Sequence, residues 1–255
     1  MQSNDIDYKI FGNDLQIVEI ELDPGETVIA EAGAMVYMEE GISFEVKMGD
    51  GTVPNPGLLG KLFQAGSRIL TGESLFLTHF THRGFGKGKV AFAAPYPGTI
   101  ISIDLAKVNQ SLIVQKNGFL CAALGTKLSV FLNRKLGSGL VGGEGFILQR
   151  LEGDGKLFIH ACGTVVEKTL VNQTLRVDTG CVVAFETSLS FDVETTGSLK
   201  SMLFGGEGMF LATLHGSGRV WLQSIPIRKL IRSLSPGGSN AGKESSSILG
   251  DLFER

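Results

Sequence analysis

The sequence predicts an all-β protein made of repeated units of short antiparallel strands, and three observations carry this prediction. Apolar and polar residues alternate with a period of two over short runs, for example over residues 175–177. Glycine occupies 35 of the 255 positions, about twice its ordinary usage, as expected for many tight turns. Segments of the chain also recur at a fixed spacing, which is typical of repeat architectures.

The clearest repeat relates residues 138–159 to residues 201–222, and places Glu144 and Glu207 at equivalent positions. The Asn-Gln-Ser/Thr-Leu sequence that begins at Asn109 recurs at Asn172 with the same offset in numbering. A third, diverged copy lies nearer the N-terminus, where residues 22–28 parallel 177–183 and residues 43–46 parallel 190–193. The predicted units are residues 8–95, 96–161 and 162–224, followed by a basic segment and flexible tail, 225–255.

Two segments depart from the strand pattern. The first unit carries an insertion at residues 48–72, with an expected amphipathic helix near 57–70 that would serve as a lid, an interface or a membrane-contact element. After Gln223, the basic residues Arg228, Lys229 and Arg232 alternate with apolar ones. This pattern favours a surface element that closes the last unit, with an anionic membrane surface or RNA as the alternative contact.

Composition restricts the class of partner and the compartment. The net charge of −3 argues against nucleic-acid binding by a basic surface. The cysteines Cys121, Cys162 and Cys181 form no CxxC pair, which indicates reduced thiols in a cytoplasmic protein. The polar, acidic start of the chain has no features of a targeting signal, and no apolar run is long enough to span a bilayer.

Motifs of known chemistry are weak in this chain. Residues 137–142 match GxGxxG, but a strand-like run follows them instead of a helix, so a glycine-bounded turn is expected there. His79 and His82 are three residues apart and should point to opposite faces of a strand, so the histidines are expected to be exposed or in hairpins, with no metal site. We therefore expect no catalytic set, no cofactor and no enzymatic activity.

Repeat-equivalent charged residues are the candidate site residues. Acidic residues follow glycine in each unit, and cations follow each Gly-x-Gly step. Because a residue present in every unit is more simply explained by structure, we expect turn residues or salt bridges between units, with ligand pockets between subdomains as the alternative. The candidates are Glu73, Glu144, Glu207, Lys89, Lys156 and Arg219.

Residues 22–35, 71–76 and 97–105 together carry a resemblance to a known family. Over residues 8–224, the chain resembles the family named in fungi for altered inheritance of mitochondria, whose bacterial members form a domain of unknown function. The resemblance implies an all-β, double-stranded β-helix-like fold similar to the tryptophan-RNA-binding attenuation protein. It also implies three subdomains per chain and a homotrimer that forms a ring of nine. Without a mitochondrial signal, the chain looks like a bacterial member, and the family supplies no catalytic residues.

Two functional hypotheses follow. The first is a non-enzymatic oligomeric β scaffold that associates with a protein or with a membrane surface. The second is a ligand- or RNA-binding ring with pockets between its subdomains. The sequence favours the first because it combines internal repetition with the lack of a recognisable catalytic set.

Overall fold

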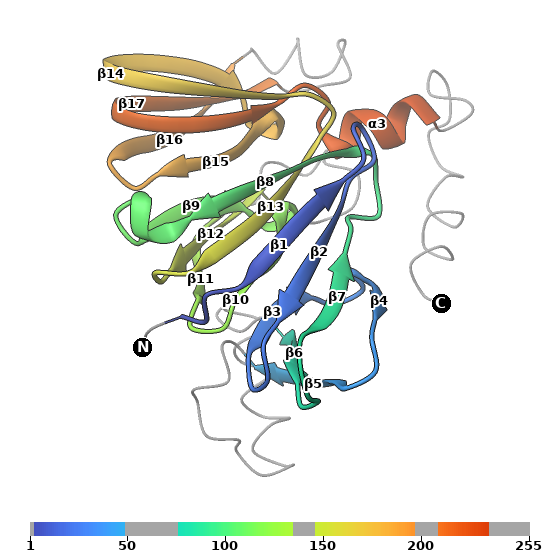
Figure 1. Cartoon of the computed structure of the whole chain (residues 1–255). Helices are drawn as coiled ribbons and strands as arrows, with labels where there is room; N and C mark the ends of the chain where they lie inside the picture. Colours follow the sequence, from blue (N-terminus) through green and yellow to red (C-terminus); the bar gives the residue numbers. More distant parts are fainter. Residues whose placement is uncertain (1–2, 49–75, 135–145, 197–208, 235–255) are drawn as a thin grey trace, which may run out of the picture.

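The computed structural model describes residues 3–48, 76–134, 146–196 and 209–234, and antiparallel strands make up most of them (Figure 1). The predicted all-β class is confirmed, with three sheets among the described residues. The predicted insertion at 48–72 and its helix near 57–70 lie outside the described residues, except for Met48, which ends a strand. In the described part of the chain, no helix is long and apolar enough to cross a membrane.

The first sheet has four strands in the order β1-β2-β7-β4. The alternation in β2 orients it: Val18, Ile20 and Leu22 are fully buried, whereas Glu19 and Glu21 lie on the opposite face. The strands are β1 (Asp7–Phe11), β2 (Ile17–Leu22), β7 (Gly88–Phe92) and β4 (Met35–Met38).

The second sheet has six strands in the order β5-β6-β3-β10-β13-β8 and joins strands of the predicted first and second units. Its central strand β10 is buried on both faces, which explains the unbroken apolar run Phe-Leu-Cys-Ala-Ala in the sequence. The strands are β5 (Ile42–Met48), β6 (Phe76–His82), β3 (Thr27–Glu31), β10 (Phe119–Ala123), β13 (Lys156–Cys162) and β8 (Gly98–Asp104).

The third sheet follows the order β11-β12-β9-β15-β17-β14, and β16 also pairs with β17. It joins strands of the predicted second and third units, and its two longest strands, β14 and β17, lie at the opposite end of the chain from β4 and β5 (Figure 1). The strands are β11 (Lys127–Arg134), β12 (Phe146–Glu152), β9 (Ser111–Gln115), β15 (Val182–Glu186), β17 (Met209–Gln223), β14 (Val165–Asp178) and β16 (Leu189–Thr196).

Helical structure among the described residues is short. Asp104 and Asp178 each cap a 3-10 turn, because their carboxylates accept hydrogen bonds from the backbone N–H groups of Ala106 and Gly180. The predicted basic segment forms a helix after the last strand. These elements are η1 (Leu105–Lys107), η2 (Lys116–Gly118), η3 (Thr179–Cys181) and α3 (Ile227–Leu234).

Three hydrophobic clusters hold the sheets together. The first cluster combines side chains of the first and second sheets, for example Ile20 and Phe158. The second combines the second and third sheets, and the third is formed by strands of the third sheet, including Phe185. Burying an aromatic side chain such as Phe158 contributes roughly 1.5–3 kcal/mol, so these clusters are the main source of stability.

Candidate functional site

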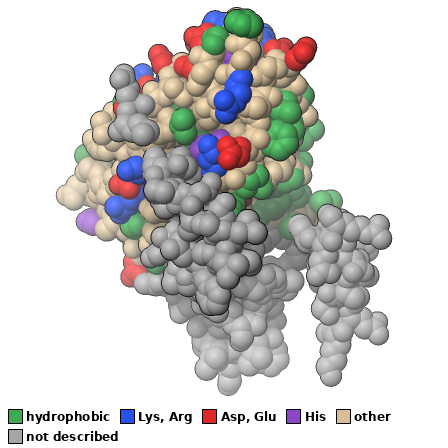
Figure 2. All heavy atoms as spheres, turned by 90° about the horizontal axis from the view of Figure 1, so that it is seen from below, with side chains coloured by type: hydrophobic (Ala, Val, Ile, Leu, Met, Phe, Trp, Pro, Cys, Tyr) green, Lys and Arg blue, Asp and Glu red, His purple; other side chains and the backbone are tan. Residues whose placement is uncertain are grey.

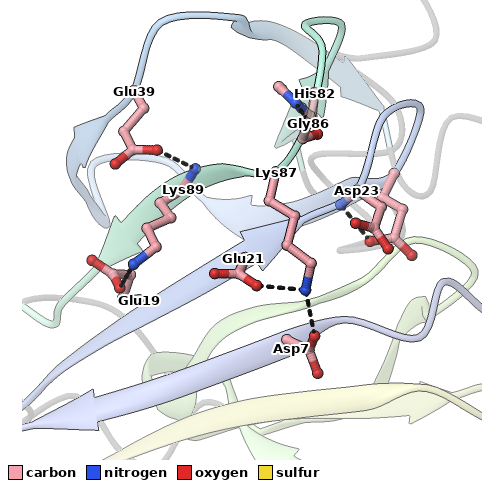
Figure 3. Close-up of polar contacts among 10 residues, drawn as sticks. Asp7, Glu19, Glu21, Asp23, Glu39, His82, Gly86, Lys87 and Lys89 are labelled. Carbon is pink, nitrogen blue, oxygen red and sulfur yellow. Dashed lines mark hydrogen bonds and ion pairs between the residues drawn. The ribbon is translucent and has the colours of Figure 1, made fainter.

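A row of ion pairs crosses the outer face of the first sheet (Figure 3). The Lys87 ammonium lies between two carboxylates on neighbouring strands, 3.1 Å from Asp7 Oδ2 and 2.6 Å from Glu21 Oε1. The hydrogen bond to Glu21, followed by that to Asp7, raises the pKa of Lys87 well above its usual range. The Lys87 side chain is half exposed, so solvent screens this bridge.

Lys89 organises a second group on the same sheet. Its ammonium lies 3.0 Å from Glu19 Oε1, and its backbone N–H donates to Glu39 Oε2 at 3.0 Å. The Tyr37 hydroxyl also donates to Glu19, so this carboxylate is held from two sides. The hydrogen bond from Tyr37, and after it the one from Lys89, lowers the pKa of Glu19.

The second predicted cation, Lys156, lies on β13 and contacts Asp104 on the paired strand β8, with 3.2 Å between Nζ and Oδ2. Lys107 also approaches this carboxylate, at 3.6 Å. Burial opposes the ionisation of Asp104, but its hydrogen bond and charge interaction with Lys156 outweigh this effect and lower its pKa.

The third predicted cation, Arg219, has the most contacts. Its Nε lies 2.7 Å from Glu186 Oε1, and its backbone N–H donates to Glu186 Oε2 at 3.1 Å. Its guanidinium stacks over the Trp221 ring at 5.2 Å, and the Trp221 indole donates to Glu167. The Arg219 Nη2 also donates to the carbonyl oxygen of Lys107 at 3.5 Å, which belongs to the predicted second unit.

The structure therefore places each of the three predicted cations in an ion pair with a carboxylate on another strand. The three predicted acids Glu73, Glu144 and Glu207 lie outside the described residues. Sequence reasoning did not single out the actual partners, Glu19, Asp104 and Glu186. The alternation of apolar and charged residues in β2 could have indicated that Glu19 is available for an ion pair, because a charged residue between buried apolar positions must point out of the core.

The prediction that the histidines are exposed or in hairpins was largely wrong, because His79, His82 and His160 are buried and only His215 is exposed. His82 ends β6, and its Nε2 lies 3.0 Å from the carbonyl oxygen of Gly86 in the turn that follows. It fits there because the glycines around the ring have no side chains. Within the described ranges, no group of three or more His, Cys, Asp or Glu residues can hold a metal ion.

His160 is the most perturbed of these residues. It is 3% exposed, its Nδ1 has no hydrogen-bond partner among the described residues, and the Tyr96 ring meets it edge-on at 4.8 Å. Burial lowers the pKa of His160 to about 4, so the ring is neutral near pH 7. The same burial raises the pKa of the Cys121 and Cys162 thiols, which makes both poor nucleophiles.

Of the strand edges that stay open within the part of the chain that the structure describes, two lie on β4 and β14, near the start and the end of the strand order. There, β4 pairs only with β7, and its residues Met35, Val36 and Tyr37 are 39–53% exposed. By contrast, β10 and β15 are each paired on both sides and contain no exposed side chain. At the other end, β14 pairs only with β17 among the described strands, and its apolar residue Val171 is 70% exposed. Open edges of this kind are templates for strand pairing.

Charge on the surface is mixed. Figure 2 shows one face of the molecule, on which basic and acidic side chains lie beside one another. This distribution agrees with the net charge of −3 and differs from the single-sign surface by which proteins grip a polyanion.

These features define a class: an antiparallel, multi-sheet β protein with ion pairs across its strands and, among its described strands, open edges at both ends. A family model described as "Mitochondrial biogenesis AIM24" matches residues 8–225, so the chain belongs to that family. It is 30% identical over 230 residues to an uncharacterized protein of Streptococcus pyogenes serotype M6, covering 88% of both proteins. A crystal structure of a Streptococcus pyogenes protein matches with a TM-score of 0.71 and 26% identity, over 90% of this chain and 98% of that one.

Proposed function

We propose that this protein is a non-enzymatic scaffold that assembles by strand pairing between copies, with β4 of one copy added beside β14 of the next. The open edges of β4 and β14 carry this proposal. The two edges belong to opposite ends of the chain (Figure 1), so the contact is head-to-tail, and such contacts close into rings when the rotation allows. Following the family resemblance, we take the closed ring to be a homotrimer in the cytoplasm.

Two junctions inside the chain support the proposed pairing. β3 pairs with β10, and β9 pairs with β15, so that one strand of each of the first two units pairs with a strand of the next unit. In the same scheme, the free edge of β14 would pair with β4 of another copy. The three receiving strands also share an irregularity: the register shifts between Met35 and Tyr37, between residues 119 and 121, and between residues 182 and 184.

Internal triplication is part of the proposal, and local geometry supports it. The 3-10 turns at 116–118 and 179–181 occupy equivalent positions of the second and third units. Asn109 and Asn172, also equivalent, both adopt positive φ, at 55° and 49°, which is uncommon outside glycine. These shared conformations are expected of repeated units with the same turn geometry.

One expected alignment within the repeat changes. The sequence pattern predicts that residues 22–28 correspond to residues 177–183, which would make β3 the counterpart of β15. In the sheets, however, β3 pairs with β6 as β9 pairs with β12, so the start of β3 at Thr27 matches the start of β9 at Ser111. β3 thus corresponds to β9, and β4 corresponds to β10 and β15.

We assign the contact with a protein partner to the outer edge of β5. Phe44 and Val46 on this strand, and Phe76 on β6, are 46–60% exposed although they are apolar. An apolar edge strand is a surface on which a partner segment can add a strand. Cosedimentation with liposomes separates this assignment from a membrane contact, because a Phe44→Ser variant that loses vesicle binding would indicate a membrane contact instead.

Native mass spectrometry of the full chain tests the scaffold. A trimer is expected at three times the chain mass of 27.2 kDa. Val36→Lys on β4 should yield monomers, because a charged edge residue opposes strand pairing. Val46→Lys on β5, a substitution at a similarly exposed edge position, is the matched control and should remain trimeric. A monomeric natural chain would refute the proposal, and a trimer with a reproducible added mass would favour the ligand-binding ring.

A further inference from the structure

Residues of β14 line an open pocket of about 620 Å³ beside the strand irregularity between Leu170 and Gln173. It lies on the strand whose outer edge is free of any described neighbour. Its lining residues are Lys168, Thr169, Leu170, Gln173, Thr174 and Leu175.

The corresponding place in the preceding repeat is occupied. Lys107 directly precedes Val108 as Leu170 precedes Val171, and the Lys107 carbonyl oxygen accepts a hydrogen bond from Arg219 Nη2. Arg219 is in turn held by Glu186, the last residue of β15. Thus, where β15 pairs with β9, the Arg219–Glu186 ion pair of the third unit lies against the backbone of the second unit.

The first unit has a cation and a carboxylate at the equivalent positions, and the Lys89 side chain itself pairs with Glu19. Lys89 follows its Gly-x-Gly step as Arg219 does, and Glu39 follows β4 directly. The backbone hydrogen bonds match: Lys89 N–H donates to Glu39 at 3.0 Å, and Arg219 N–H donates to Glu186 at 3.1 Å. Glu39 is exposed and Lys89 is partly exposed, so both can reach a neighbour.

We propose that the pocket on β14 is a half-site completed by a second copy of this chain, whose Glu39–Lys89 pair enters it. The inference rests on the proposed pairing of β4 with β14. In the completed site, the Lys89 ammonium keeps its contact with Glu19 and also donates to the Leu170 carbonyl oxygen, as Arg219 donates to the Lys107 carbonyl oxygen while it is held by Glu186. The Glu39 carboxylate then lies close to the ammonium of Lys168, one of the pocket residues.

The β9–β15 junction also sets the register of this contact. There, Leu112 pairs with Glu186 and Val114 pairs with Ala184. The repeat equivalents of Leu112 and Val114 in the third unit are Leu175 and Val177. When the register shifts of β4 and β15 are aligned, the counterparts of Glu186 and Ala184 in the first unit are Glu39 and Tyr37. The expected intersubunit pairs are therefore Leu175 with Glu39, and Val177 with Tyr37.

Disulfide trapping in the full chain tests this register. Val177→Cys and Tyr37→Cys are combined in a Cys181→Ser background, because Cys121 and Cys162 are buried. Directly opposed residues of antiparallel strands come close enough for a disulfide. Oxidation should therefore link the copies covalently. The matched control replaces Tyr37→Cys by Val36→Cys, which shifts the pair by one residue to the other face of the strand and should not cross-link.

A charge exchange tests the pocket separately. Glu39→Lys should weaken association at least tenfold in an assay of dissociation on dilution, and adding Lys168→Glu should restore most of it. A trimer that forms without the Val177–Tyr37 cross-link, or is insensitive to Glu39→Lys, would overturn the half-site but leave the scaffold standing. A natural chain that never associates would overturn both.

Discussion

Lowering the pH should destabilise this protein through His160, whose imidazole is buried. Among the described residues its Nδ1 has no hydrogen-bond partner, and the neighbouring Tyr96 hydroxyl donates away from it, to the Asn117 carbonyl. In the unfolded chain His160 should titrate near 6.5, whereas burial lowers its pKa to about 4 in the fold. Between these values the unfolded chain binds more protons than the folded one, so stability falls as the pH falls.

The size of the effect follows from the shift of the His160 pKa. A difference of about 2.5 pH units corresponds to roughly 3 kcal/mol once the pH is below 4, and about 2 kcal/mol of this is lost by pH 5. Glu19 and Asp104, whose pKa values are lowered, lose their stabilising ionisation at lower pH, because their unfolded values lie near 4.5 and 3.8. We therefore assign the change in stability between pH 7.5 and pH 5 to His160.

Urea unfolding at fixed protein concentration, at pH 7.5 and pH 5, measures this change. His160→Phe should remove about 2 kcal/mol of the difference between the two pH values, whereas His215→Gln, at an exposed position, should leave the difference unchanged. Should His160→Phe fail to fold, an NMR titration of the natural chain gives the His160 pKa directly. An unchanged pH difference in His160→Phe, or a titration near 6.5, would refute the reasoning.

Two further predictions concern packing and ion pairs. Gly88→Ala should lower stability by roughly 1–3 kcal/mol in urea unfolding, because the added Cβ would lie 2.8 Å from the buried His82 ring; unchanged stability would show that the ring can move aside. Arg219→Met should cost roughly 1–2 kcal/mol, since it leaves the largely buried Glu186 carboxylate without its cation. Lys87→Met, which removes a bridge in solvent, should shift the urea midpoint less, and equal effects would contradict this ranking.

The strand class and many side-chain directions were predictable from local pattern. The order Ile-Val-Glu-Ile-Glu-Leu in β2 dictates which residues face the core, and the structure buries Val18, Ile20 and Leu22 accordingly. The charged positions after each Gly-x-Gly step were found because they repeat. The histidines were misjudged for the opposite reason: burial of His82 depends not only on the nearby Gly84 and Gly88 but also on Gly41 of another segment, which no local pattern around His82 reveals.

Partners of the candidate residues could not be predicted, because they lie far apart along the chain. Lys89 contacts Glu19 across 70 residues, and Arg219 contacts Glu186 across 33. Which carboxylate faces which cation depends on strand order and register, and a shift by one residue would turn every side chain to the other face.

The sequence by itself determined the all-β class, the spacing of its repeats and the family, because these depend on local periodicity and on the order of motifs. Only the tertiary structure decided that each of the two larger sheets joins strands of successive predicted units, so that β10 and β15 are enclosed while β4 and β14 keep an edge that no described strand covers. The physical reason is that the backbone N–H and C=O groups of a strand bond to neighbouring strands that are distant in sequence. Only the assembled sheets show which strands still have an edge without such a neighbour.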